Sequence, residues 1–159
     1  MNQIAPSRGS VPVGHISELD SMEAASVLYF RLWFDGPESR KNVWNDFATA
    51  LGPETGKRAV SALEEICRAC VDLCRRPIMR HQVTCQCIGA DEACLANLVG
   101  AATDGQREDA LLLSLLLFEP DFAPLLVGHA ESLGTALRKM NLGNAPRPTH
   151  ANSSNRSLH

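Results

Sequence analysis

Apolar residues recur every three to four positions along most of this chain, which is the period of an α-helix with one buried face. The first such stripe follows Asp20, whose spacing of three residues from Glu23 predicts a capped helix start. Glycine followed by proline, at 36–37 and again at 52–53, separates this helix from two more, because glycine ends helices and proline starts them. The clearest stripe lies in the last helix and consists of Phe122, Leu125, Leu126, His129, Leu133, Ala136, Leu137 and Met140.

These stripes predict an all-α protein, a single compact bundle of about five to six helices. Residues 78–90, IMRHQVTCQCIGA, carry no helical stripe and are predicted to form a loop or a short extended turn. The segments 1–19 and 142–159 are rich in Pro, Ser, Asn and Gly, so we expect flexible tails on both sides of a helical domain at 20–141. The expected helices cover residues 20–35, 37–51, 53–76, 91–103, 107–118 and 122–142.

Length and charge narrow the class of protein. A chain of 159 residues with a net charge of −3 is large enough to bury a core without help from disulfides. Residues 57–80 carry an excess of positive charge, yet this patch is too weak to indicate nucleic-acid binding. No apolar run is long enough to cross a membrane, and the N-terminus lacks the apolar core of a secretory signal. We therefore expect a soluble, cytoplasmic protein that acts through a protein partner.

The unusual chemistry of the chain is concentrated in residues 67–94, a window of 28 residues that contains all six cysteines. Cys67, Cys70 and Cys74 fall at positions i, i+3 and i+7 of the third expected helix and therefore share one face. Because unpaired cysteine is commonly buried as a small apolar residue, core packing is one explanation for these three thiols. Metal binding is the other, although one zinc ion cannot reach both Cys67 and Cys74 without distortion.

The loop residues His81, Cys85 and Cys87 lie outside any apolar stripe, so packing explains them less well than metal binding does. Thiolates and imidazoles are ligands that zinc prefers. The spacing His81-x3-Cys85-x-Cys87 resembles the zinc-binding H-x3-C-x2-C element of some anti-sigma factors, but the second gap is one residue shorter and no family assignment follows. An iron–sulfur cluster is the alternative metal group, although its familiar cysteine spacings are absent. The leading hypothesis is a structural or sensory zinc site with ligands drawn from Cys70, Cys74, His81, Cys85, Cys87 and Cys94.

A metal-free thiol redox switch is the second hypothesis. Cys94 follows Asp91 by three residues, in the expected first turn of a helix, where the helix dipole favours a thiolate. This position makes Cys94 the leading candidate for a reactive thiol, although the neighbouring carboxylates Asp91 and Glu92 oppose the shift and an ordinary half-buried cysteine is the other description. A reversible disulfide could join Cys94 to Cys85 or Cys87, or could join Cys85 to Cys87.

A helical interaction module whose cysteines only fill the core is the third hypothesis. The sequence contains no phosphate-binding glycine loop, no GxSxG and no HExxH, which favours a non-catalytic, regulatory protein over an enzyme. His129, on the apolar stripe of the last helix, is expected to be a hydrogen-bonded core histidine.

Overall fold

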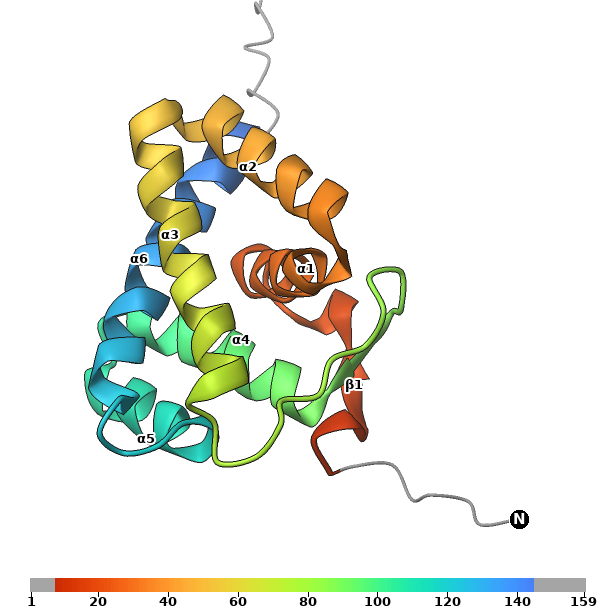
Figure 1. Cartoon of the computed structure of the whole chain (residues 1–159), viewed down its shortest axis with the longest axis vertical. Helices are drawn as coiled ribbons and strands as arrows, with labels where there is room; N and C mark the ends of the chain where they lie inside the picture. Colours follow the sequence, from red (N-terminus) through yellow and green to blue (C-terminus); the bar gives the residue numbers. More distant parts are fainter. Residues whose placement is uncertain (1–7, 145–159) are drawn as a thin grey trace, which may run out of the picture.

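The computed structural model describes residues 8–144, and within that range six α-helices pack into a bundle (Figure 1). This confirms the prediction of a compact, mostly helical protein. A two-stranded sheet, β1 (Pro12–His15) with β2 (Cys87–Gly89), lies at one side, and two short 3-10 helices, η1 (Arg8–Ser10) and η2 (Ile16–Glu18), flank β1. The helices are α1 (Ser21–Asp35), α2 (Pro37–Leu51), α3 (Pro53–Asp72), α4 (Ala90–Thr103), α5 (Arg107–Leu117) and α6 (Ala123–Asn144).

Local signals in the sequence set the helix boundaries. The Asp20 carboxylate accepts a hydrogen bond of 2.8 Å from the Glu23 backbone N–H, which caps α1 as its spacing predicted. Gly36 and Gly52 adopt φ angles of 135° and 84°, which L-residues rarely adopt, and each precedes a proline in the first turn of the next helix. A single residue therefore connects α1 to α2, and a single residue connects α2 to α3.

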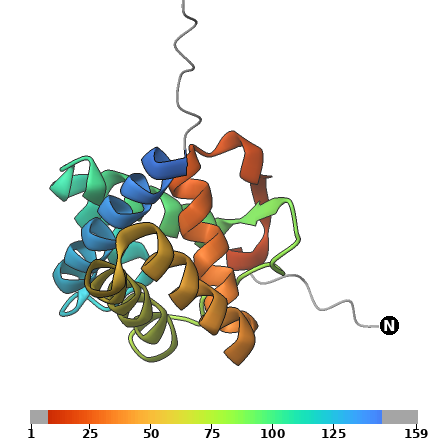
Figure 2. The ribbon, with the colours of Figure 1, turned by 90° about the horizontal axis from the view of Figure 1, so that it is seen from above.

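The core is formed mainly by α1, α3, α4 and α6. Helix α3 packs against α2 and α6, while α4 packs against α1, α5 and α6. Figure 2 shows α1 between α6 on one side and the segment that leads into α4 on the other. No helix in the part of the chain that the structure describes is long and apolar enough to cross a membrane.

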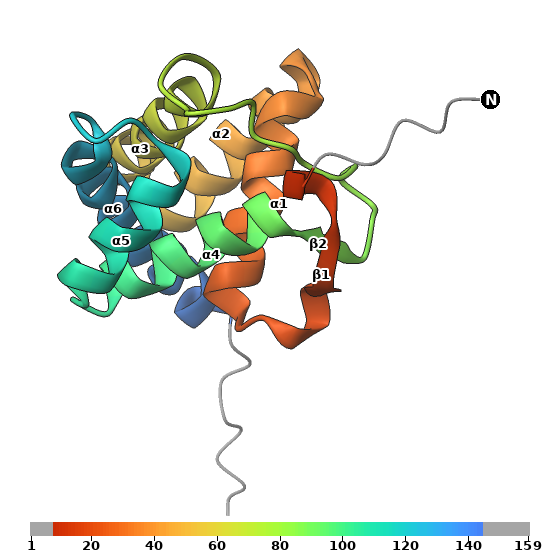
Figure 3. The same ribbon diagram turned by 90° about the horizontal axis from the view of Figure 1, so that it is seen from below.

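In the N-terminal region, for which the sequence predicted a flexible segment at 1–19, regular backbone structure is present from residue 8 onward. Residues 8–19 form η1, β1 and η2, and β1 pairs antiparallel with β2 so that His15 lies opposite Cys87 (Figure 3). The backbone also joins the two segments through hydrogen bonds from Ile16 to Gln86 and from Ala90 to Val11. Residues 1–7, and residues 145–159 of the expected C-terminal tail, lie outside the described residues.

Helix α3 ends at Asp72, four residues before the expected end. The backbone of Cys74 instead forms an isolated bridge with Phe118, at the end of α5. After this bridge, residues 75–86 cross the bundle towards β2. They contain part of the cysteine-rich window at 67–94.

Candidate functional site

The candidate site is the loop between α3 and β2, residues 73–86, which we call the crossing loop. Figure 1 shows it as the yellow-green trace that leaves the end of α3, passes below the bundle and returns beside α1. Only short pieces of regular backbone hold such a segment in place, so side chains must satisfy its polar groups. Two acidic residues in the first turn of α4, Asp91 and Glu92, do so, and they are 2% and 0% exposed.

Glu92 forms a buried ion pair with Arg31 of α1, which is 1% exposed. Arg31 Nε and Nη2 donate to the two carboxylate oxygens at 2.7 and 2.8 Å, a two-point contact. The remaining N–H groups of Arg31 donate to main-chain oxygens of the site, namely Gln82 (3.2 Å), Cys85 (2.7 Å) and Cys87 (2.8 Å). All five N–H groups of this guanidinium therefore have partners, and three of those partners lie in or beside the crossing loop.

The Glu92 carboxylate holds the loop from its other side. It accepts hydrogen bonds of 3.0 Å from the backbone N–H groups of His81 and of Gly89. Burial by itself would raise the pKa of Glu92, but the hydrogen bonds from Arg31, Gly89 and His81 outweigh burial and lower it. Glu92 is therefore a buried, charged anchor for both ends of the segment 81–89.

Asp91 anchors the first part of the crossing loop in the same way. Its two carboxylate oxygens accept hydrogen bonds from the Arg76 guanidinium at 2.6 and 2.9 Å, and Oδ2 also accepts from the Met79 backbone N–H at 2.8 Å. Asp91 and Glu92, which are consecutive residues of α4, thus hold successive parts of the crossing loop in place.

His81 and Cys85 lie together within the segment that these anchors hold. The Nε2 atom of His81 lies 3.0 Å from the carbonyl oxygen of Ser10, and the Nδ1 atom lies 3.7 Å from Cys85 Sγ. A carbonyl oxygen can only accept, so Nε2 carries the proton and, in the neutral ring, Nδ1 is the acceptor that faces the thiol. The arrangement contains a thiol, a base and a third group that orients the base.

Solvent reaches this part of the loop. Both Cys85 and His81 are partly exposed, and His81 lines a hollow of about 650 Å³ together with Arg80 and Gln82. Because both side chains are partly exposed, a small oxidant can reach the pair from solvent.

Cys67, Cys70 and Cys74 do not share this environment. Cys67 and Cys70 are buried in the main core, as the packing explanation expected. Burial raises the pKa of Cys67, and a hydrogen bond with Cys74 together with burial raises that of Cys70. Cys74 lies just beyond α3, with its thiol 3.4 Å from the carbonyl oxygen of Ala69.

Cys94 does not have the activated environment that its position predicted. Burial, followed by the charge of Asp91, raises its pKa to about 11, so its thiolate is scarce at neutral pH. Because α4 begins at Ala90, Cys94 is its fifth residue and lies past the unpaired N–H groups of the helix start. Its Sγ instead lies 3.7 Å from the carbonyl oxygen of Leu113.

The six residues predicted as metal ligands fall into separate groups. Cys70 and Cys74 are joined by a hydrogen bond near the end of α3, Cys94 lies against α5, and His81 and Cys85 are neighbours in the crossing loop. Within residues 8–144, no group of three or more His, Cys, Asp or Glu side chains is placed to hold a metal ion. The described residues therefore contain no three-ligand site that would support the zinc prediction.

The sequence reasoning missed Arg31, the paired role of Asp91 and Glu92, and the part played by Ser10. Arg31 carried a usable signal, because it follows the buried Val27 by four residues and so shares the core-facing side of α1. A lone arginine at such a position indicates a buried partner.

Comparison with known protein families, curated proteins and solved structures finds no match for this chain.

Proposed function

We propose that this protein is a thiol-based redox switch in which Cys85 is the sensing residue and His81 is its base. The observation that carries the proposal is the 3.7 Å separation between Cys85 Sγ and the acceptor nitrogen Nδ1 of His81. An imidazole in this position can accept the thiol proton and leave a thiolate, which is the form that reacts with oxidants. The proposal therefore assigns the sensing role to Cys85 and not to Cys94, which was the candidate from the sequence.

The oxidant in this proposal is hydrogen peroxide. The Cys85 thiolate attacks one peroxide oxygen, the O–O bond breaks, and the second oxygen leaves as hydroxide, which takes the proton held by His81 and becomes water. Cys85 is oxidised to a sulfenic acid and the peroxide is reduced. The Cys87 thiol then attacks the sulfenic sulfur, so that a disulfide forms and a second water leaves. A reducing dithiol reverses the disulfide by exchange.

Disulfide formation requires the backbone between Cys85 and Cys87 to change. Side chains two residues apart in extended chain lie about 7 Å apart, whereas a disulfide needs Cβ atoms about 4 Å apart. The carbonyl oxygens of both cysteines are bonded to Arg31 in the reduced protein. Oxidation would therefore release at least one of these bonds and change the loop surface that a protein partner contacts.

Thiol labelling followed by mass spectrometry tests the proposal. At neutral pH, Cys85 should react with iodoacetamide faster than Cys94, and His81→Gln should slow Cys85 by about tenfold or more because glutamine cannot take up the proton. Peroxide should link Cys85 to Cys87, and Cys87→Ser should trap a sulfenic acid that a dimedone probe detects. Cys94→Ser is the matched control and should respond like the unaltered protein. Labelling of Cys85 that is no faster than that of Cys94, or unaffected by His81→Gln, would refute the switch.

Zinc binding is the second candidate function, and the same pair of residues favours it. Two ligands on a tetrahedral zinc ion, a sulfur at about 2.3 Å and a nitrogen at about 2.0 Å, lie roughly 3.5 Å apart, close to the observed separation. The remaining ligands would have to come from outside this pair. Metal analysis of protein purified without an affinity-tag metal separates the candidates: zinc near one per chain, lost in both His81→Gln and Cys85→Ser, supports zinc over the switch.

A further inference from the structure

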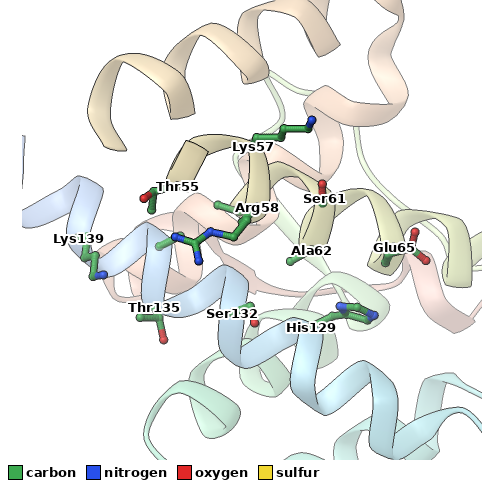
Figure 4. A pocket seen from close by; sticks show the side chains of 12 residues that line it. Thr55, Lys57, Arg58, Ser61, Ala62, Glu65, His129, Ser132, Thr135 and Lys139 are labelled. Carbon is green, nitrogen blue, oxygen red and sulfur yellow. The ribbon is translucent and has the colours of Figure 1, made fainter. Parts of the chain in front are cut away.

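A groove with a volume of about 470 Å³ lies between α3 and α6 (Figure 4). Its floor is made of small apolar residues, Ala59, Ala62 and Ala136, which lets the two helices lie close while leaving a channel. Small-molecule sites in proteins commonly have this size and an apolar floor.

The two ends of the groove differ in chemistry. Figure 4 shows Arg58 reaching from α3 towards α6, with Lys139, Thr55 and Thr135 at the same end. Two cations and two hydroxyl groups therefore gather at this end. A phosphate, with up to two negative charges and three free oxygens, matches such a set of donors better than a carboxylate does.

Neither cation has an acidic partner in the part of the chain that the structure describes. Among residues 8–144, no acidic side chain lies within ion-pair distance of Arg58 or Lys139, whereas the neighbouring Arg138 pairs with Asp104 at 2.7 Å. The positive charge at this end of the groove is thus available to a ligand.

The other end of the groove carries Glu65 on α3 and His129 on α6 (Figure 4). His129 lines the groove and is partly exposed, which differs from its expected place in the core. Glu65 contacts Arg68 at 3.2 Å, but both side chains are solvent-exposed and such pairs are weak. Glu65 follows Arg58 by seven positions, which corresponds to roughly 10 Å along the helix.

We infer that the α3–α6 groove binds a small phosphate monoester whose far end carries an amine. The phosphate contacts Arg58 and Lys139, the chain between the two groups lies on the alanine floor, and the amine contacts Glu65. This site is separate from the crossing loop and does not depend on the redox proposal.

Amide NMR spectra of the full chain, titrated with aminohexyl phosphate, test this inference. This probe has about the required distance between its charged groups, and it should shift and saturate signals of α3 and α6. Arg58→Gln and Lys139→Gln should each weaken binding by about tenfold or more, because each removes a charge-assisted contact with phosphate. Arg107→Gln removes an exposed arginine at the start of α5 and should bind like the unaltered protein. Thermal denaturation verifies that each variant is folded.

The amine end has its own comparison. Glu65→Gln should weaken aminohexyl phosphate and leave hexyl phosphate, which has no amine, unchanged. Equal weakening of both probes by Glu65→Gln would overturn the assignment of this end. The site as a whole is overturned if aminohexyl phosphate shifts no groove signals, or if folded Arg58→Gln and Lys139→Gln variants both bind it as tightly as the unaltered protein.

Discussion

Arg31 and Glu92, 61 positions apart in the sequence, contact each other through two hydrogen bonds with both side chains withdrawn from water. Transferring two charges from water into a protein interior costs several kcal/mol each, unless they are well paired and their remaining polar atoms are satisfied. Both conditions are met here. The other N–H groups of Arg31 donate to main-chain oxygens of the crossing loop and β2, and the Glu92 carboxylate oxygens accept hydrogen bonds from backbone N–H groups of the same two segments. The pair therefore joins α1, α4 and the loop.

Replacing Arg31 with methionine should lower the free energy of unfolding by about 3–5 kcal/mol, since it leaves the Glu92 carboxylate buried without its partner. Arg31→Lys keeps the charge but cannot supply five N–H groups, so it should also destabilise the protein and loosen the loop. Urea unfolding measures the first effect, and NMR signals of residues 81–89 report the second. The double variant Arg31→Met with Glu92→Met should be more stable than Arg31→Met alone, and a double variant of equal or lower stability would contradict this account.

The lowered pKa of Glu92 predicts a loss of stability in acid. A carboxyl group with a lowered folded-state pKa stabilises the fold above its unfolded pKa, which is ordinarily about 4.3, and the contribution disappears as the pH falls through the folded value. Carboxyl ¹³C NMR should therefore show Glu92 titrating below this ordinary value. Glu23 provides the contrast, since burial and then the charge of Asp20 raise its pKa. A titration of Glu92 at or above the ordinary value would show that its anchoring is weaker than the geometry indicates.

The environment of Cys94 predicts a specific pH dependence of its labelling. Its rate of alkylation should be low at neutral pH and should rise towards a plateau above about pH 11, because only the thiolate reacts. Quantitative mass spectrometry over a pH series measures this midpoint. Rapid labelling of Cys94 near pH 7 in folded protein would restore it as the reactive thiol of the chain.

Two glycines on different helices should respond to alanine in opposite ways. A Cβ atom on Gly56 would lie 2.8 Å from the Phe47 carbonyl oxygen and 2.9 Å from the Ala48 backbone, so Gly56→Ala should cost about 1–3 kcal/mol by forcing α2 and α3 apart. Gly128 in α6 has open space around it, so Gly128→Ala should add up to about 1 kcal/mol through helix propensity. Thermal denaturation compares the two, and a Gly56→Ala variant that is as stable as the unaltered protein, or more stable, would contradict the close packing at Gly56.

The helices could be predicted because local signals determine them. Asp20, Gly36 and Gly52 lie at the boundaries that their side chains or backbone freedom favour. The early end of α3 at Asp72 could not be predicted in this way, since no glycine or proline marks it and the next residues pair with the chain near Phe118. The sheet was also missed, because β1 and β2 are short and each is stabilised by a partner some 70 positions away.

The candidate site was predicted only in part. The spacing of His81 and Cys85 identified the pair that the structure brings together, whereas the position of Cys94 suggested an activation that burial opposes. Neither the tautomer of His81 nor the anchoring by Arg31 is encoded by nearby residues. Both depend on contacts between segments that are distant in the sequence, which spacing alone does not reveal.

The group that orients His81 is a main-chain oxygen, that of Ser10. No substitution of the Ser10 side chain can remove this oxygen, so point changes at that position leave the acceptor in place. A change in the path of the chain can remove it, for example a cut between η1 and β1 or an alanine at Gly9, whose Cβ would collide with the Asp91 carboxylate. The choice of which His81 nitrogen carries the proton therefore depends on the path of the whole N-terminal segment that forms η1 and β1. Proteolysis in this segment could alter the reactivity of the Cys85 thiol although every cysteine remains unchanged.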